Sequence, residues 1–517
     1  MKPYVVYEKL PPMDPPAPKD SPRRLLLPAV LCALLGSLSL LLLLPCFGLG
    51  GAAVLQGQSG DSGCGDTCRA VLVESTPQGV PPGPHPSTFS SWLRIIGTAR
   101  RSLDIASFYW TLSNRDTATH EPSAAPGERI LAELLQLPRR GVAVRVAVSA
   151  PTHTTPMGDL LALQSSGAAV RAVDVGRLAG GVLHTKLWVA DGAHVYLGSA
   201  NMDWRSLTQV KELGVAIYNC SCVAQDVAKV FEAYWALGAP NASIPTPWPS
   251  NFSTPFNMET PLQLRLNGTP SALYFSSSPP SFCAAGRTPD LNAILGVIDA
   301  AQQFVSVAVM SYLPATEFRR PDRFWPEIDD GLRRAVFERG VAVRLLVGCW
   351  AHSKAAMFPF LRSLAAIADN ATRFSAEVRL FVVPSTAAQS RIPYARVSHQ
   401  KYMVTEKAAY IGTSNWSADY FQRTAGSALV LQHTGSPPST EPTLRAQLQS
   451  SFERDWGSPY SIDIGDTERW QQHCGPPGGD AVTPHPFWVH NAPVWGLRGW
   501  SGMTDVRWGL RVMGGSP

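Results

Sequence analysis

The stretch His184-Thr-Lys-Leu-Trp-Val-Ala-Asp191, followed by Gly198-Ser-Ala-Asn201, decides the fold because a near copy stands in the second half of the chain. The copy reads His399-Gln-Lys-Tyr-Met-Val-Thr-Glu406, followed by Gly412-Thr-Ser-Asn415. In each copy His and Lys are two positions apart, an acid comes five residues after the Lys, and a Gly-[Ser/Thr]-x-Asn turn follows. Residues i and i+2 of an extended strand point to the same side, so each His and Lys share a face. One copy would be weak evidence, whereas two copies with the same spacing indicate a duplicated unit.

The segments before the two motifs repeat as well. Gly141-Val-Ala-Val-Arg-Val-Ala-Val resembles Gly340-Val-Ala-Val-Arg-Leu-Leu-Val, and residues 128–137 and 328–338 place apolar residues at helical spacing. The order strand, helix, strand, helix, strand, motif strand therefore occurs twice. The strands are nearly continuous apolar runs, as expected of a sheet covered on both faces. The sequence predicts two similar α/β domains related by a pseudo-twofold axis, with one active site shared at their interface.

Length and composition limit the organisation of the chain. Its 517 residues allow two to four domains, and 45% hydrophobic with 16% charged residues argue against wholesale disorder. A net charge of +5 permits anionic partners without marking a nucleic-acid binder. We expect a cytoplasmic tail at residues 1–24 and a transmembrane signal anchor at 25–55. Two α/β domains should follow, at 56–270 and 271–470, and a C-terminal tail of uncertain fold at 471–517.

The segment from Leu25 to about Leu55 contains no charged residue and is long enough to span a bilayer. Basic residues at 19, 23 and 24 precede it and Asp61 follows it, so the positive-inside rule predicts a single-pass type II protein with a lumenal catalytic part. The small residues at 48–53 leave a cleavable signal peptide as the alternative. In the tail, Tyr7-Glu-Lys-Leu10 resembles a clathrin-adaptor sorting signal, although ordinary disordered tails contain the pattern by chance.

Sequons and cysteines fit a lumenal location. The acceptor sequons begin at Asn219, Asn241, Asn251, Asn267 and Asn370. Asn415 also starts a sequon, but it lies inside the second motif, where we expect it to be buried and unmodified. Glycosylation of the five acceptors is the expectation that follows.

Seven of the nine cysteines fall after the apolar segment, in a compartment that favours disulfides. Two closely spaced pairs, Cys64 with Cys68 and Cys220 with Cys222, would face each other and tie the start of the lumenal part to the strand after the first motif. Pairing of Cys349 with Cys474 would leave Cys283 free. Sequence alone does not fix this connectivity, and a zinc site made by the first four cysteines is the alternative.

Convergence of the two motifs would bring together His184, Lys186, His399 and Lys401. Such a cluster is strongly cationic and lacks the pair of carboxylates that sugar chemistry uses, so it suits a phosphodiester. One imidazole can attack phosphorus to form a phosphohistidine. The other can protonate the leaving oxygen and later activate water. The two histidines should titrate as a coupled pair, and an imidazole pKa near 6.5 makes an acidic optimum natural.

The remaining motif residues receive supporting roles. We expect the non-bridging oxygens to be held by Lys186, Lys401, Asn201 and Asn415. Ser199 and Thr413 would add hydroxyl donors. Asp191 and Glu406 are included in the catalytic set as groups that orient the His and Lys side chains. Because fixed protein cations neutralise the substrate, no metal or other cofactor is required.

Other candidate residues have no duplicated context. His153, His194 and His352 are therefore interpreted as surface or core histidines. The aromatic run Phe108-Tyr-Trp110 and the pair Cys349-Trp350 are interpreted as core in preference to base-stacking platforms.

The paired H-x-K-x(4)-D/E motifs with their trailing G-[ST]-x-N turns resemble the phospholipase D superfamily over residues 65–465. Gly198-Ser-Ala-Asn-Met-Asp-Trp-Arg-Ser-Leu-Thr and Gly412-Thr-Ser-Asn-Trp-Ser are similar to its endolysosomal type II membrane branch, members three and four, and the tail and anchor look more like member four. The resemblance implies two α/β/α sandwich domains and a lysosomal 5′→3′ exonuclease acting on single-stranded DNA and RNA. By analogy His184 is the nucleophile and His399 the general acid.

The resemblance carries further expectations. It implies passage through the endoplasmic reticulum and Golgi to endosomes and lysosomes, and limitation of nucleic-acid sensing by endosomal Toll-like receptors. A transphosphatidylase that makes bis(monoacylglycero)phosphate from lysosomal phospholipids is the alternative activity, and a homodimer and proteolytic release of the lumenal part are further expectations. Glu406 replaces the superfamily's usual Asp, a change that the branch shares. A catalytically inactive receptor or scaffold is a third hypothesis, which the two intact motifs oppose.

Overall fold

The repeat is built as two mixed β-sheets. The first contains β1 (Arg69–Ser75), β2 (Ser102–Ser107), β4 (Ala143–Ser149), β5 (Ala169–Val173), β6 (Leu187–Ala190), β7 (His194–Gly198) and β9 (Glu212–Tyr218). The second contains β10 (Leu262–Leu266), β11 (Thr269–Ser278), β12 (Thr288–Pro289), β13 (Phe304–Val309), β15 (Ala342–Cys349), β16 (Ala376–Val382), β17 (Lys401–Thr405), β18 (Ala408–Gly412), β20 (Gly426–His433) and β21 (Ser461–Asp463).

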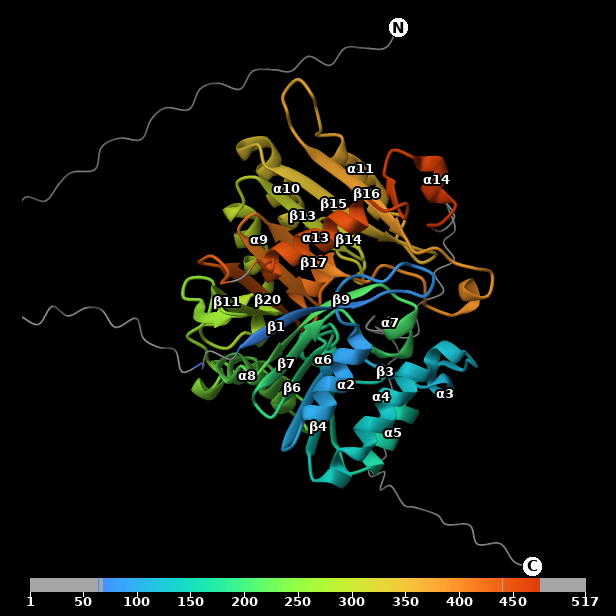
Figure 1. Cartoon of the computed structure of the whole chain (residues 1–517), viewed down its shortest axis with the longest axis vertical. Coiled ribbons are helices and arrows are strands. Elements are labelled where there is room, and N and C mark those ends of the chain that lie inside the picture. Colours follow the sequence, from blue (N-terminus) through green and yellow to red (C-terminus); the bar gives the residue numbers. More distant parts are fainter. Residues whose placement is uncertain (1–63, 65–67, 439, 475–517) are drawn as a thin grey trace, which may run out of the picture. The chain divides into compact units, whose positions relative to one another are not determined.

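Strand order is the same in the two sheets. The first runs β1-β9-β7-β6-β2-β4-β5, and the second contains β11-β20-β18-β17-β13-β15-β16 in the corresponding places, with β10 and β21 added at its edges. Two short parallel pairs repeat in the same way: β3 (Trp110–Thr111) with β8 (Met202–Asp203), and β14 (Tyr312–Leu313) with β19 (Trp416–Ser417). Figure 1 shows the halves as neighbouring groups, blue to green and yellow to red. The predicted α/β class is confirmed.

Helices connect the parallel strands in the predicted order. They are α4 (Ala125–Gln136) and α5 (Gly158–Ser165) in the first half, and α10 (Glu327–Arg339) and α11 (Met357–Ala365) in the second. Helix α4 begins three residues before the apolar pattern because Pro126 suits the first turn, where no amide donor is needed. Helix α10 ends where Gly340 adopts a left-handed φ of 65°.

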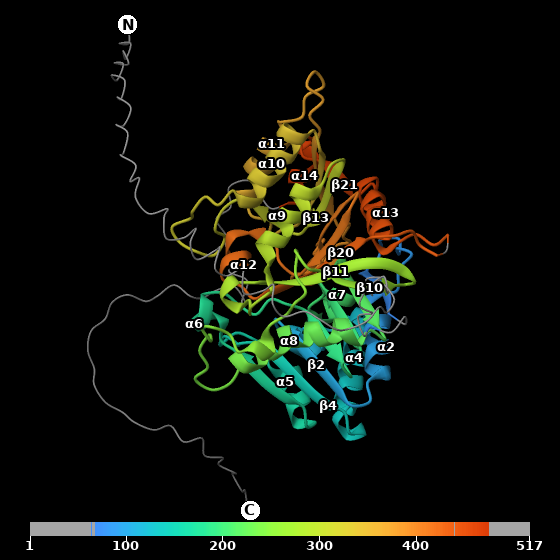
Figure 2. The same ribbon diagram turned by 90° about the vertical axis from the view of Figure 1, so that its left-hand side faces the viewer.

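Three large clusters of buried apolar side chains form most of the core of the described residues. One packs the first sheet against α4, α5 and α2 (Thr88–Thr98), with Trp92 fully buried. Another packs the second sheet against α10, α11 and α9 (Asp290–Ala300). The third joins both sheets to α8 (Ser221–Leu237) and α13 (Leu444–Trp456) through side chains such as Phe231 and Phe452. Figure 2 shows the second sheet between α9–α11 on one side and α13 on the other.

The computed structural model describes residues 64, 68–438 and 440–474. The expected cytoplasmic tail, the membrane anchor, the segment Tyr7–Leu10 and nearly all of the C-terminal tail lie outside these residues. No helix among the described residues has the length and apolar character needed to cross a membrane. The domain limit expected at residue 270 falls within β11, and the second sheet already starts at Leu262 with β10.

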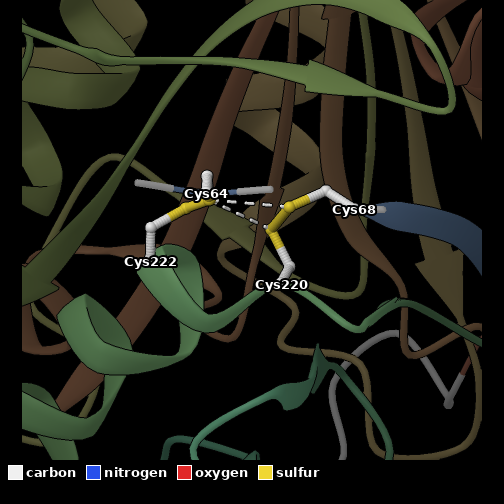
Figure 3. A group of neighbouring side chains, drawn as sticks. All are labelled: Cys64, Cys68, Cys220 and Cys222. Atoms are coloured by element: carbon white, nitrogen blue, oxygen red, sulfur yellow. Dashed lines mark hydrogen bonds between the residues drawn. A yellow bond between two sulfur atoms is a disulfide. The ribbon is translucent and has the colours of Figure 1, made fainter. Parts of the chain in front are cut away.

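Three disulfides join segments that are distant in the sequence. They pair Cys64 with Cys222, Cys68 with Cys220 and Cys349 with Cys474, and Cys283 keeps a free thiol. The first two lie side by side and tie the entry of β1 to the start of α8 (Figure 3). Their four sulfur atoms lie within 4.8 Å of one another, a spacing that a metal could also use, but they are consumed in disulfides. The predicted disulfides are therefore found in place of the zinc alternative.

The sequon asparagines differ in exposure as expected. The five acceptors Asn219, Asn241, Asn251, Asn267 and Asn370 are all exposed, whereas Asn415 is buried. The Asn267 side chain also accepts a hydrogen bond from the backbone N–H of Ala70 at 2.9 Å and donates one to its carbonyl at 2.8 Å. Asn415 is thus shielded from modification in the folded chain.

Candidate active site

Two equivalent backbone bridges bring the half-motifs together. Leu183 bridges Ala425, and the His184 N–H donates to the carbonyl of Ala425 at 2.8 Å. At the corresponding place, Lys211 bridges Ser398, and the His399 N–H donates to the carbonyl of Lys211 at 2.8 Å. Each motif therefore starts hydrogen-bonded to the other half of the molecule, just before β20 or β9.

The four motif side chains form one buried cationic cluster. His184 and Lys186 are each 2% exposed, and His399 and Lys401 are 9% and 1% exposed. Each Lys Nζ donates to the carbonyl of its own His, at 2.5 Å in the first motif and 2.6 Å in the second. The charges of Lys401 and His399 act on His184, so the two half-motifs occupy one electrostatic site.

The pKa values of the clustered side chains indicate a site that favours binding of an anion. Burial, followed by the charges of Lys186, Lys401 and His399, lowers the pKa of His184 well below its usual value, which favours the neutral imidazole that a nucleophile needs. Burial also lowers the pKa of Lys186 well below its usual range and that of Lys401 to about 7. A bound phosphodiester would reverse these shifts because its negative charge favours the protonated lysines.

Glu212 is the functional residue that the repeat comparison missed. Its Oε2 lies 2.8 Å from His399 Nδ1, and its Oε1 accepts a hydrogen bond from Ser206 Oγ at 3.0 Å. The pKa of His399 is lowered to about 4, chiefly by burial, and the Glu212 carboxylate limits this shift by favouring the imidazolium. Glu212 thus fixes the ring of His399 and supports its protonated form, as a general acid needs.

The second half has no counterpart of Glu212. The symmetry of the two bridges puts Gly426, after Ala425, where Glu212 follows Lys211. A Cβ atom on Gly426 would lie 2.4 Å from Ser414 Oγ, so the packing there excludes a side chain. His184 instead makes a hydrogen bond with the backbone of Thr413. Two similar sequence motifs therefore produce two histidines in different environments.

The hydroxyl groups of Ser199 and Thr413 bond to neighbouring strands in the structure, in contrast to the donor role toward substrate that the sequence suggests. Ser199 Oγ donates to the Leu213 carbonyl at 3.1 Å and accepts from the Leu213 N–H at 3.0 Å. Thr413 Oγ1 makes the same pair of bonds with Ser427, at 3.2 and 3.0 Å. A hydroxyl has a single proton to donate, and here it is used to join neighbouring strands.

Asp191 and Glu406 do not orient the His and Lys side chains, which is a second correction. Asp191 lies beyond the far end of β6, where its carboxylate accepts from the backbone N–H groups of residues 100, 101 and 102 at 2.7–2.8 Å. Glu406 accepts in the same way from the N–H groups of residues 302, 303 and 304. Both acids therefore shape the backbone at the start of β2 or β13 rather than the chemistry.

The two turn asparagines remain suited to binding substrate oxygens. Asn201 and Asn415 are 7% and 5% exposed, and the Oδ1 atom of each is buried without a hydrogen-bond partner among the described residues. Asn415 Nδ2 donates to the Tyr420 hydroxyl at 3.0 Å. Because an amide can turn to present either its oxygen or its NH₂ group, both side chains have unused bonding capacity beside the cluster.

Aromatic side chains wall the cluster. The rings of Phe108 and Tyr420 lie 5.3 and 5.1 Å from the ring of His184, centroid to centroid, and Lys186 Nζ lies 5.6 Å from that of Phe108. Trp110 is fully buried, as expected of core. Trp350, in contrast, is only half-buried.

The histidines outside the two motifs lie at or near the surface. His153 is exposed, and His194 accepts from the backbone N–H of Asn219 at 3.2 Å. His352 is exposed and stacks on Tyr394 with ring centroids 5.3 Å apart. Among the described residues, the cysteine quartet is the one group of three or more His, Cys, Asp or Glu side chains close enough to hold a metal ion.

Two His-Lys motifs contributed by repeated halves to one buried site form an arrangement suited to phosphodiester chemistry with a histidine nucleophile. A family model described as "PLD3/4, PLD-like domain" matches residues 82–386, and the chain belongs to this family. The α/β fold and the duplicated motif agree with that membership.

Close relatives match across most of the chain. The chain is 57% identical over 418 residues to the 5′-3′ exonuclease PLD3 of Xenopus laevis, covering 80% of this chain and 85% of the relative. It is 58% identical to human 5′-3′ exonuclease PLD3, covering 78% and 82%, and 49% identical to human 5′-3′ exonuclease PLD4, covering 77% and 79%. The sequence identity over the matched regions is thus higher to PLD3 than to human PLD4. The N-terminal tail and the anchor, in contrast, look more like member four.

Proposed function

We propose that this chain is a 5′-3′ exonuclease that hydrolyses phosphodiester bonds of single-stranded DNA and RNA through a phosphohistidine intermediate. The observation that carries the proposal is the buried cluster in which a neutral His184 and a carboxylate-supported His399 face two lysines. The exonuclease names of relatives at 49–58% identity support the substrate and the direction of digestion.

In the proposed reaction the two histidines have different roles. An imidazole nitrogen of neutral His184 attacks phosphorus, so a P–N bond forms while the P–O bond to the leaving group breaks. The proton of the His399 imidazolium goes to the leaving oxygen. His399, now neutral, takes a proton from water, whose oxygen attacks phosphorus and breaks the P–N bond. Glu212 keeps the His399 ring in place through both steps.

Charge on the phosphoryl oxygens is met by fixed protein groups. With a phosphodiester bound, whose charge favours the protonated lysines, Lys186 and Lys401 would supply two positive charges beside the histidines, and Asn201 and Asn415 have amide groups available for hydrogen bonds. Such preorganised groups stabilise charge that builds up in the transition state. Catalysis therefore requires no metal, and activity should persist in the presence of a chelator.

A digestion assay with the full chain tests this function. Single-stranded and duplex DNA, labelled at the 5′ or the 3′ end, would be incubated between pH 4 and pH 8 with and without chelator. The proposal expects shortening of single strands from the 5′ end, loss of activity in His184→Asn and His399→Asn, and no effect of chelator. Intact single strands after incubation with wild-type chain, or digestion from the 3′ end, would contradict it.

The cellular setting follows from the same chemistry. Disulfides and exposed sequon asparagines suit the lumen of the secretory and endolysosomal pathway, where thiols oxidise and glycans are added. We infer that a type II anchor at residues 25–55 holds the enzyme there, that Tyr7–Leu10 binds clathrin adaptors, and that digestion limits Toll-like receptor sensing. Microscopy of the tagged chain with a Tyr7→Ala variant tests the routing, since loss of lysosomal signal is expected.

A further inference from the structure

We propose that the loop at residues 350–356 carries a base-stacking subsite of the active site, built around His352 and completed by Trp350 and Tyr394. The inference rests on the proposed action on nucleic acid and deepens it, because it names the part of the substrate that the chain recognises. The ligand is the planar base of a nucleotide whose phosphodiester occupies the histidine cluster.

Both ends of the loop are fixed beside the second half-motif. At its start, β15 runs so close to the motif that a Cβ atom on Gly348 would lie 2.6 Å from the carbonyl oxygen of Ser398, the residue before His399. At its end, Met357 Sδ accepts a hydrogen bond from the N–H of Tyr312, in the strand that pairs with β19 just after Asn415. The loop therefore passes along the edge of the sheet where the catalytic groups stand.

Three rings from two segments gather at this loop. Trp350 and His352 meet edge to face with centroids 4.7 Å apart, and His352 stacks on Tyr394 at 5.3 Å with an interplanar angle of 29°. A turn in which Ser353 and Trp350 exchange two hydrogen bonds, at 3.1 and 3.0 Å, fixes the start of the loop. The cluster combines an exposed imidazole with half-buried rings, unlike the fully buried tryptophans of the core.

The first half of the molecule contacts the segment that carries Tyr394. Arg205 donates to the carbonyl of Pro393 at 2.6 Å and forms an ion pair with Asp203, whose carboxylate accepts from the Tyr109 hydroxyl at 3.0 Å. Tyr109 adjoins Phe108, the ring that packs on His184. A continuous set of contacts thus connects the segment before Tyr394 with the nucleophile.

Stacking on aromatic rings is the interaction that every base can make, whatever its sequence. The head group and acyl chains of a phospholipid offer no planar ring to such a surface. A subsite of this kind would therefore favour single-stranded nucleic acid over lipid at a site whose reaction chemistry suits both. It would also favour single strands over duplexes, because bases in a duplex are already stacked.

An oligonucleotide without bases separates recognition of the base from chemistry at the phosphate. The full chain would be assayed for kcat/KM on a 5′-labelled thymidine oligomer and on an oligomer of the same length made of abasic tetrahydrofuran nucleotides. His352→Ala should lower kcat/KM on the thymidine oligomer roughly five- to hundredfold, the range that loss of one base–aromatic stack produces. The same variant should act like wild type on the abasic oligomer, and His352→Phe should restore the preference.

The outcomes are distinct. Equal losses on both oligomers, or no loss on either, would overturn the stacking subsite while leaving the exonuclease proposal intact. If the wild-type chain cleaved neither oligomer, the proposed function would fail, and fluorescence anisotropy would still decide the subsite. In that case tighter binding of the thymidine oligomer than of the abasic one, abolished by His352→Ala, supports stacking, and equal binding refutes it.

Discussion

Replacing Glu212 with Gln tests the division of labour between the two histidines. Glutamine keeps the size of the side chain and its hydrogen bonding to Ser206, but it removes the negative charge 2.8 Å from His399 Nδ1. The carboxylate raises the pKa of His399 against the effect of burial. Without it the pKa must fall below about 4, so less of the general acid is protonated at every pH above that value.

The size of the effect follows from the strength of the lost bond. A buried hydrogen bond to a charged group contributes about 1.5–3 kcal/mol. With about 1.4 kcal/mol per pKa unit, the alkaline limb of the kcat/KM profile should move about 1–2 units toward lower pH. At a fixed pH above the limb, kcat/KM should fall roughly 10- to 150-fold.

The assay is the pH dependence of single-strand digestion, with Glu406→Gln as the matched control. Glu406 is also a motif acid, but its carboxylate binds backbone N–H groups. The control should lose stability and keep the wild-type pH profile. An unchanged profile in Glu212→Gln, or the same shift in both variants, would refute the assignment of His399 as a general acid supported by Glu212.

Three further predictions concern the scaffold and the substrate path. Asp191→Asn should lower the melting temperature by a few degrees, because a carboxylate that accepts three backbone bonds is lost, and should leave kcat/KM within about twofold. A wild-type melting temperature with reduced kcat/KM would instead show that Asp191 takes part in the reaction. Gly426→Ala should destabilise the chain by about 1–3 kcal/mol in denaturant unfolding, since its Cβ would lie 2.4 Å from a serine oxygen. Gly97→Ala, with open space around it, is the control and should not destabilise. Lys354, whose Nζ lies 5.8 Å from the Phe318 ring near the site, should contact a phosphate of the strand. Lys354→Gln should therefore reduce the salt dependence of log KM by about 0.7 with kcat unchanged, and an unaltered slope would exclude that contact.

Much of the fold could be predicted from the sequence because the sequence contains an internal repeat. The matched strands around Val144 and Val343 and the helices before them predicted two α/β units, and both sheets have the same strand order. The sequence also predicted that the four clustered cysteines form disulfides, because they fall in two closely spaced pairs, although it left their connectivity open. The motif spacing also identified the four histidine and lysine side chains that meet in the site.

Some residues match between the two motifs because both copies need them for folding, and the sequence comparison wrongly gave these residues a role in the reaction. Ser199 and Thr413 match each other because both join two strands, and Asp191 and Glu406 match because both cap a backbone turn. The comparison missed Glu212 for the opposite reason, since Gly426 stands in its place and the pattern disappears.

What the halves share therefore describes mainly the scaffold, and what differs describes the roles of the histidines. Sequence spacing cannot show this because Glu212 acts on a histidine of the other half through space. The bridge between Lys211 and Ser398 brings the two residues together in the folded chain.

The most direct test of the central claim is to identify the histidine that becomes phosphorylated. The full chain and its His399→Asn variant would be quenched during reaction with an oligonucleotide that carries a good leaving group, digested at neutral pH and examined by mass spectrometry. We expect an esterified phosphoryl group on the peptide containing His184, which accumulates in His399→Asn because no base activates water, and which is absent in His184→Asn. An adduct on His399 in the wild-type chain, or turnover by His184→Asn at the wild-type rate, would contradict it.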